Sequence, residues 1–214
     1  MFDGTVRSCQ VAPRPHRVGD MSDVIVFDLF GVIARRQTPE AVRRIEETAG
    51  VSGTRFWDAY WSCRPAYDSG QESPEYWANV ADRLGTAFPD VPALIEADLD
   101  SWTEADDAMV ALVHELADQG RTLGLLSNII GDLVPRFEAR HRDWLSRFDA
   151  LVYSCDIGVA KPDPRAYEIC AARLGVDLTD ALFFDDTERN VLAARTTGMR
   201  AELFTTIDQV RAIL

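Results

Sequence analysis

The 214-residue sequence predicts an α/β protein. We expect a Rossmann-like parallel sheet with helices on both faces, plus a small all-helical cap inserted after the first strand. Two observations support this fold class. Beyond about residue 104, apolar segments of strand length alternate with amphipathic helical segments, and such alternation builds a parallel sheet. Before that, from about residue 35 to residue 103, the pattern is helical throughout.

The first strand is the most strongly marked element. Residues 24–27 are four consecutive apolar residues, which is typical of a fully buried strand. Asp28 follows directly, and Gly31 comes three residues later. Ligands of open α/β sheets bind at the carboxyl ends of the strands, so Asp28 is a candidate for chemistry. The alternative is that Asp28 only caps the turn that follows.

We expect the chain to divide into three parts. Residues 1–21 form a flexible N-terminal tail, and Met21 is a candidate for the true start. Residues 22–34 and 104–214 form the α/β core domain, and residues 35–103 form the helical cap. The cap is predicted to contain four helices, namely Pro39–Ala49, one capped by Ser52, one from Ser73 that Gly85 ends, and one over Pro89–Trp102.

The core beyond residue 104 is predicted as alternating helices and strands. The expected strands are Thr122–Leu126, Ala150–Tyr153, Ala181–Phe184 and Ala201–Phe204. The expected helices are Ala105–Gln119, 132–148 with a break, Pro164–Leu174, Thr187–Thr197 and Ile207–Leu214.

The amino-acid composition excludes some classes of binding partner for this protein. The formal net charge of −13 repels nucleic-acid phosphates and anionic lipids, so we expect neither nucleic acid nor a membrane as a partner. No apolar run approaches the ~18 residues of a membrane span. The four cysteines are scattered without metal-site spacing, which predicts reduced thiols and a cytoplasmic location. The three histidines (His16, His114 and His141) are expected on the surface.

Polar residues follow several of the predicted strands. They are Asp28, Ser127, Asn128, Lys161, Asp185 and Asp186, and the ends of parallel strands lie on one edge of the sheet. Three carboxylates crowd together in ionised form only if a cation neutralises them. Oxygen ligands without His or Cys favour Mg²⁺. Ser127 and Lys161 would then hold a phosphate, leaving Asp28 as a carboxylate nucleophile.

Lys161 is unusual in a second respect. Of the 22 basic residues it is the one lysine, and all the others are arginines. A lysine ammonium is a compact point charge, whereas arginine is a planar fork, so the two are not equivalent. A single lysine at a predicted strand end therefore adds to the case for a site there.

Four motifs in order resemble the haloacid dehalogenase (HAD) superfamily of hydrolases. They are the strand ending at Asp28 with Leu29-Phe30-Gly31-Val32 after it, Leu126-Ser127-Asn128, Lys161-Pro162-Asp163-Pro164 with Tyr167, and Phe183-Phe184-Asp185-Asp186 with Asn190. The resemblance covers residues 22–208. It is closest to subfamily I, which has a small helical cap, and to a branch that includes sugar-phosphate phosphatases, partly through Tyr67-Asp68-x-Gly70.

The resemblance implies a role for each matching residue. Asp28 would be the nucleophile that forms an aspartyl-phosphate, with Ser127, Asn128 and Lys161 as its catalytic and substrate-binding partners. Mg²⁺ would be held by Asp28, Asp186 and the backbone carbonyl of Phe30, with Asp185 close by or ligating and Asn190 bracing the site. In the cap, Trp61, Arg64 and Tyr67 are expected to contact substrate, although most aromatic residues there would simply form its core.

One position departs from the phosphatase pattern. Most phosphatases of this superfamily have an acid/base aspartate two residues after the nucleophile, and here that residue is Phe30. Loss of a positioned acid/base group costs on the order of 10²–10⁴ in rate. The resemblance implies a Mg²⁺-dependent phosphatase acting on a small phosphorylated metabolite, such as a sugar phosphate. With Phe30 in this position, either the substrate has a good leaving group, or another group serves as acid/base, or turnover is slow. The alternatives are a 2-haloacid dehalogenase and a catalytically weak or silent binding protein.

Overall fold

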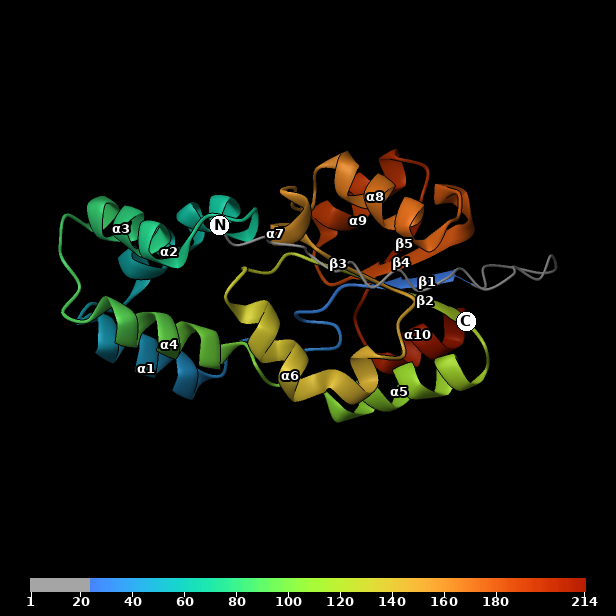
Figure 1. Ribbon diagram of the computed structural model, residues 1–214, viewed down its shortest axis with the longest axis horizontal. Helices are drawn as coiled ribbons and strands as arrows, with labels where there is room; N and C mark the ends of the chain where they lie inside the picture. Colours follow the sequence, from blue (N-terminus) through green and yellow to red (C-terminus); the bar gives the residue numbers. More distant parts are fainter. Residues whose placement is uncertain (1–23) are drawn as a thin grey trace, which may run out of the picture.

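The computed structural model describes residues 24–214, which fold into a parallel sheet flanked by helices, with four more helices at one end (Figure 1). The predicted α/β class is confirmed. The predicted tail at residues 1–21 and the start at Met21 lie outside the described residues.

The first strand of the chain lies at the centre of the sheet. The strand order is β3-β2-β1-β4-β5, and every neighbouring pair is parallel. The strands are β1 (Val24–Phe27), β2 (Thr122–Ser127), β3 (Ala150–Tyr153), β4 (Ala181–Asp185) and β5 (Arg200–Leu203). Because all strands run the same way, their carboxyl ends share one edge.

Successive residues of β1 point to opposite faces of the sheet, which is why the whole strand is apolar. Ile25 and Phe27 join a core with α5 (Asp107–Asp118), α6 (Leu133–Leu145) and α10 (Ile207–Ile213). Val24 and Val26 join a second core with α8 (Pro164–Leu174) and α9 (Glu188–Thr196) on the other face. Figure 1 shows these two helical layers above and below the sheet.

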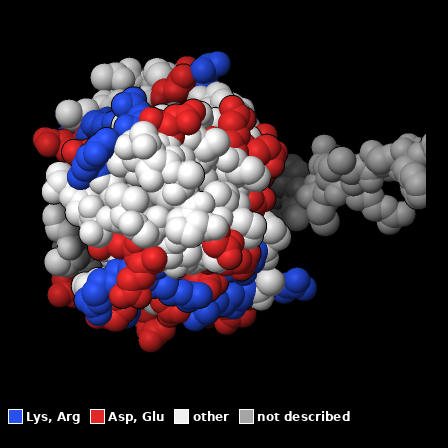
Figure 2. All heavy atoms as spheres, turned by 90° about the vertical axis from the view of Figure 1, so that its left-hand side faces the viewer, with Lys and Arg blue, Asp and Glu red and all other residues white. Residues whose placement is uncertain are grey.

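Four helices lie beside the sheet rather than on it (Figure 1). They are α1 (Pro39–Ala49), α2 (Thr54–Asp68), α3 (Ser73–Leu84) and α4 (Val91–Ser101). Helix α1 packs against α4 and α2 packs against α3, around buried aromatic rings such as Phe56 and Trp77. The outer end of this group shows uncharged atoms in the middle, with acidic and basic side chains around them (Figure 2).

The two chain segments that join these four helices to the sheet run side by side. Ala34 forms an antiparallel bridge with Ala105. The Arg35 amide donates to the Glu104 carbonyl at 2.8 Å, and the Asp106 amide donates to the Ile33 carbonyl at 2.8 Å. We therefore retain the proposal that residues 35–103 form a cap on a core of residues 22–34 and 104–214.

The element boundaries follow the sequence closely, with local exceptions. Helix α2 begins after Gly53, not after a Ser52 cap, because Glu46 of α1 accepts hydrogen bonds from the Gly53 amide and the Trp57 indole. The predicted break in α6 is at His141, which has non-helical backbone angles. Two short elements are not predicted, namely α7 (Ser154–Ile157) and a 3₁₀ turn at Leu178–Asp180, because four residues or fewer show no periodicity.

The two histidines that the structure describes are less exposed than the sequence analysis expects. His114 and His141 are both half-buried. The His141 ring packs against Phe137, and its Nε2 lies 2.7 Å from the carbonyl oxygen of Thr103. Helix α6 turns this ring towards the segment after α4, which a single-helix pattern does not reveal.

No helix within residues 24–214 combines the length and the apolar character needed to cross a membrane.

Candidate functional site

Three carboxylates meet at the carboxyl edge of the sheet. Asp28 follows β1, Asp185 ends β4, and Asp186 is the next residue. The register pairs Phe27 with Phe184, so Asp28 and Asp185 are neighbours across the two strands. One oxygen from each of the three carboxylates lies within 4.8 Å of those from the other two.

Lys161 joins two of these carboxylates. Its Nζ lies 2.6 Å from Oδ1 of Asp28 and 2.7 Å from Oδ2 of Asp185, and the residue is only 3% exposed. The loop that carries Lys161 is held by Asn128, whose side-chain oxygen accepts from the Lys161 amide and whose amide group donates to the Lys161 carbonyl. Asn128 thus fixes the backbone from which the ammonium extends.

Burial and charge set the protonation of this pair. Burial raises the pKa of the Asp28 carboxyl to about 7, with Lys161 opposing the rise and Asp185 adding to it. Burial by itself would lower the pKa of the Lys161 ammonium, but Asp28 and Asp185 outweigh it and hold that pKa above its usual value. The lysine is therefore a fixed positive charge, whereas Asp28 can exchange a proton near neutral pH.

The two oxygens of Asp28 have different surroundings. Oδ1 accepts from the Leu29 amide at 2.7 Å and from the Lys161 ammonium. Within residues 24–214, no hydrogen bond is made to Oδ2. One oxygen is thus anchored, and the other is left with its lone pairs available.

Asp185 is the most enclosed of the three carboxylates. It is fully buried, and Asn190 of α9 donates to both of its oxygens at 3.1 Å. The Thr187 amide, at the start of α9, donates to Oδ1 at 2.8 Å. A helix N-terminus attracts a negatively charged group, so α9 contributes to the position of the Asp185 side chain.

Asp186 has a different neighbour, the guanidinium of Arg36. Nη2 and Nε of Arg36 lie 2.6 Å and 3.0 Å from Oδ2 of Asp186. The turn at Gly31, where φ is +89°, makes room for this contact, because a Cβ there would lie 1.7 Å from the same oxygen. The chain around residue 31 therefore requires glycine for both space and conformation.

Two further residues complete the edge. Ser127 ends β2 and is fully buried, and its hydroxyl has no hydrogen-bond partner among the described residues. Phe30 packs edge-on against Trp102 and Phe137, with ring centroids 5.1 Å and 6.0 Å apart. A buried hydroxyl without a hydrogen-bond partner is unusual, and the Ser127 hydroxyl is therefore free to bind a ligand, whereas the side chain of Phe30 contributes an apolar wall.

Comparison of the sequence with family models assigns the chain to a known family. The model of the haloacid dehalogenase-like hydrolases matches residues 22–198. The chain belongs to the haloacid dehalogenase-like hydrolase family.

Individual relatives support the same assignment. The chain is 31% identical to Phosphatase MT3486 of Mycobacterium tuberculosis (strain CDC 1551 / Oshkosh), over 87% of this chain and 89% of that protein. It is 26% identical to validoxylamine A 7'-phosphate phosphatase of Streptomyces hygroscopicus subsp. limoneus, over 90% of each. A magnesium complex of a HAD family enzyme from Bacteroides thetaiotaomicron has the same fold, with a TM-score of 0.71 and 16% identity over 88% of this chain and 96% of that one.

In this HAD-like hydrolase, the predicted site residues fall into two groups. The structure brings together Asp28, Ser127, Asn128, Lys161, Asp185, Asp186 and Asn190 at the carboxyl edge of the sheet, with Phe30 beside them. The three predicted substrate contacts lie in a separate aromatic cluster on α2, namely Trp61, Arg64 and Tyr67. That cluster reaches the sheet edge through Trp102, which contacts both Trp61 and Phe30.

Arg64 is engaged within that cluster. Its side chain donates to Asp68 at 2.8 Å and to the Tyr60 hydroxyl at 2.6 Å, and it lies 3.9 Å from buried Asp98. Tyr67 is buried and its hydroxyl shares a hydrogen bond with Ser73 at 2.6 Å. Trp61 is 49% exposed. Of the three predicted substrate contacts, Trp61 is therefore the one with a broad open face.

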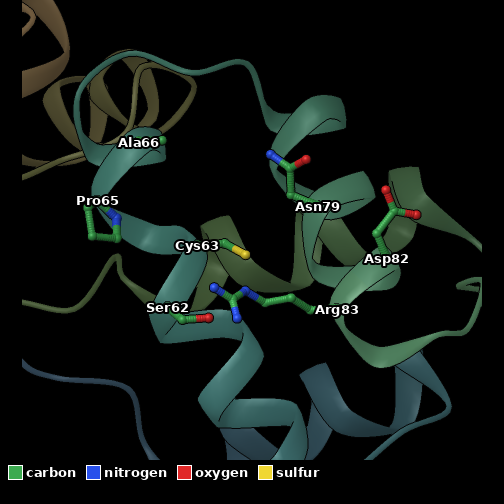
Figure 3. A pocket seen from close by; sticks show the side chains of 7 residues that line it. All are labelled: Ser62, Cys63, Pro65, Ala66, Asn79, Asp82 and Arg83. Atoms are coloured by element: carbon green, nitrogen blue, oxygen red, sulfur yellow. The ribbon is translucent and has the colours of Figure 1, made fainter.

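A surface pocket lies elsewhere, between α2 and α3 (Figure 3). It is lined by Ser62, Cys63, Pro65, Ala66, Asn79, Asp82 and Arg83. None of these residues belongs to the carboxylate cluster, so the candidate site of this hydrolase is the sheet edge.

Sequence reasoning missed two contributors to the site of this HAD-like hydrolase. Arg36 is one of 21 arginines and carries no motif that marks it out. Thr187 contributes its backbone amide, and the sequence does not reveal which backbone groups point into a site. A helix start directly after Asp185-Asp186 was the one available signal for the latter.

Proposed function

We propose that this hydrolase is a Mg²⁺-dependent phosphatase acting on a small phosphorylated metabolite, such as a sugar phosphate. The observation that carries the proposal is Lys161, whose buried ammonium lies 2.6 Å from Asp28 and 2.7 Å from Asp185. A fixed positive charge beside a carboxylate with one open oxygen suits attack on a phosphate dianion. The phosphatases of Mycobacterium tuberculosis and Streptomyces hygroscopicus that the chain resembles support the same class of reaction.

The donors fit a magnesium ion. Three carboxylates lie within reach of one another, and all are hard oxygen ligands of the kind Mg²⁺ prefers. Asp28, Asp186 and the backbone carbonyl of Phe30 would hold the ion, with Asp185 beside them, and Asn190 would keep Asp185 in place. A Cβ at residue 31 would fill this space, so the cradle depends on Gly31. When bound, the ion supplies positive charge that offsets the charge of the transferring phosphoryl group.

The chain's own residues carry the two chemical steps. Oδ2 of Asp28 attacks phosphorus as the bond to the leaving oxygen breaks, which gives an aspartyl-phosphate and the leaving group as an anion that takes its proton from solvent. A water molecule then attacks phosphorus and breaks the bond to Asp28, which restores the carboxylate and releases inorganic phosphate; one proton of the water stays on the phosphate and the other passes to solvent. Lys161 and the free hydroxyl of Ser127 hold the phosphoryl oxygens during both steps, and Asn128 keeps the Lys161 loop in position.

The leaving oxygen must depart without help from residue 30. Phe30 packs against Trp102 and Phe137 and has no proton to give. This favours phosphates whose leaving group is stable as an anion, such as an anomeric sugar phosphate or an acyl phosphate. Closure of the proposed cap, residues 35–103, over the sheet edge would bring Trp61 towards the rest of the substrate, with Arg64 and Tyr67 behind it.

Composition supports a proposal for the location of the protein and for the class of its partners. The net charge of −13 disfavours nucleic acid and anionic membranes as partners, and the scattered cysteines favour the cytoplasm. A small anionic metabolite can still bind, because Lys161 provides a local positive charge.

Hydrolysis of p-nitrophenyl phosphate tests the proposal, because nitrophenolate leaves without an acid. The assay uses the wild type with Mg²⁺, the wild type with EDTA, and Asp28→Asn with Mg²⁺. We expect activity in the first reaction alone. Equal activity with EDTA would contradict the magnesium requirement, and equal activity in Asp28→Asn would contradict the nucleophile.

A second candidate, a 2-haloacid dehalogenase, is favoured by one observation. Phe30 is aromatic, and a halide needs no proton on departure. The acidic pair Asp185 and Asp186 opposes this candidate, because dehalogenation at Asp28 requires no cation. Halide release from 2-chloropropionate in EDTA would support it, and failure of both assays would leave a phosphometabolite-binding protein.

A further inference from the structure

Arg36 is an exposed cation attached to an otherwise enclosed site. It belongs to the segment that leads from the sheet to α1, two residues after the bridge between Ala34 and Ala105. Its Nη2 and Nε both contact Oδ2 of Asp186, at 2.6 Å and 3.0 Å. Its side chain is 68% exposed, whereas that of Asp186 is 13% exposed.

The backbone is shaped to allow this contact. At Gly31 an added Cβ would lie 1.7 Å from Asp186 Oδ2 and 3.2 Å from Arg36 Nε. The Gly31 amide donates to the Ala34 carbonyl at 2.7 Å, which closes the turn and sends the chain back past Asp186. The contact between Arg36 and Asp186 is therefore a product of the same turn that carries Asp28 and Phe30.

The charges of the site nearly balance. Asp28, Asp185 and Asp186 supply three carboxylates, and Lys161 and Arg36 supply two cations. Lys161 is enclosed and contacts two carboxylates, so its withdrawal would leave both without a partner. Arg36 makes two hydrogen bonds to a single oxygen of one carboxylate, and its own side chain is exposed, so its removal to solvent costs less than withdrawal of the buried Lys161.

We propose that Arg36 is an exchangeable counter-cation of Asp186, which weakens divalent-metal binding at the carboxylate cluster and gives way when a divalent ion arrives. The proposal rests on the proposed magnesium site. It adds a residue that acts on the metal through Asp186 and sets how much Mg²⁺ the site requires.

The same contact could serve an opposite role, because a hydrogen-bonded arginine can also orient a carboxylate for a metal. The two roles predict opposite signs. Removing the positive charge tightens the binding of a divalent ion if Arg36 competes, since two like charges near one carboxylate repel. Removing the charge loosens that binding if Arg36 mainly orients Asp186.

The experiment compares Mg²⁺ affinity by isothermal titration calorimetry for the wild type, Arg36→Gln, Arg36→Lys and Arg35→Gln, without substrate and at low ionic strength. Glutamine keeps a donor for Asp186 but not the charge, and lysine keeps the charge. Arg35→Gln is the matched control, because Arg35 is the adjacent residue, is 57% exposed in its side chain and pairs with Asp106, away from the cluster.

We expect Arg36→Gln to bind Mg²⁺ about tenfold more tightly than the wild type, as a Coulomb interaction over ~6 Å in water implies. Arg36→Lys and Arg35→Gln should stay within about threefold of the wild type. The gain in Arg36→Gln should shrink in 1 M KCl, where exposed charges are screened over about 3 Å.

The possible results separate the two proposals. Equal or weaker binding in Arg36→Gln, with Mg²⁺ still bound by the wild type, would overturn the role of Arg36 and leave the magnesium site intact. A similar gain in Arg35→Gln would also overturn it, since the effect would then be one of general charge. Absence of Mg²⁺ binding in every variant would overturn both proposals, whereas binding in Arg36→Gln alone would support both.

Discussion

Gly31 and Asp186 approach so closely that a Cβ at residue 31 would lie 1.7 Å from Oδ2 of Asp186. The first turn after β1 and the end of β4 therefore pack so tightly that one additional carbon atom at residue 31 would overlap with the carboxylate of Asp186. This contact links a backbone conformation to the position of a carboxylate, and it leads to the first prediction.

Gly31→Ala should disturb the site beyond its effect on stability. Positive φ costs alanine about 1–2 kcal/mol, and the methyl group would in addition displace Asp186. We expect lower stability in urea and a loss of Mg²⁺ affinity of tenfold or more. Gly198→Ala is the control, because Gly198 has φ +91° and an added Cβ there would meet nothing within 4 Å, so this variant carries the strain without the clash. Equal metal affinity in both variants would refute the steric argument.

Asp28→Asn should stabilise the metal-free protein, and more so at higher pH. Burial raises the folded-state pKa of Asp28 to about 7 from 3.8, so the folded protein holds this proton more tightly than the unfolded chain. The contribution of Asp28 to stability is therefore present at low pH and falls as pH rises between about 4 and 7, by at most ~1.4 kcal/mol per pH unit. Asparagine does not titrate.

Urea unfolding in EDTA at pH 5 and pH 8 measures this difference. The advantage of Asp28→Asn over the wild type should be larger at pH 8. Asp163→Asn serves as the control, because Asp163 beside Arg165 has its pKa lowered to about 2 and stays ionised at both pH values. An advantage that is the same at both pH values would show that burial of Asp28 is not costly.

The rate of hydrolysis should depend steeply on the leaving group. With Phe30 unable to donate a proton, kcat/KM should fall sharply from aryl to alkyl phosphates. Phe30→Asp should raise the rate for alkyl phosphates by up to ~10²-fold and leave p-nitrophenyl phosphate nearly unchanged. Phe30→Asn loses the same packing without gaining an acid and should show no such gain. A shallow dependence in the wild type would point to a proton donor elsewhere.

Arg64→Met should destabilise the protein by ~3 kcal/mol, because it leaves the fully buried Asp98 without its cation. Arg83→Met removes an exposed arginine from neighbouring α3 and should change stability by less than ~0.5 kcal/mol. Chemical denaturation measures both. If Arg64→Met kept its stability and instead raised KM, Arg64 would be a substrate contact, as the sequence predicts.

Much of this fold is predictable from local patterns. The helices Pro39–Ala49 and Pro164–Leu174 begin and end at the predicted residues, because proline at the start and glycine after the end define both. Strands β1 to β4 are recognisable as largely apolar runs, and the shared carboxyl edge follows from the rule for parallel sheets. The convergence of Asp28, Lys161 and Asp185 is therefore an expectation that sequence alone supports.

Contacts between distant residues that no motif or strand end marks cannot be predicted from the sequence. The pairing of Arg36 with Asp186 spans 150 positions, and no motif marks Arg36. The start of α2 at Gly53 depends on Glu46 from another helix. The sequence predicts that Arg64 faces substrate, yet the helix phase and its two carboxylate neighbours place it in a buried ion-pair network. Each of these depends on tertiary packing, which local propensity does not encode.

The enclosed position of Lys161 has a practical consequence for anyone who handles the protein. The chain has one lysine, and that lysine is 3% exposed and held between two carboxylates. Amine-reactive reagents should therefore acylate this lysine of the folded protein only as fast as the sheet edge opens. Mass spectrometry of the labelled peptides over time would give the rate at which Lys161 is acylated. This rate measures local opening of the site without any engineered probe.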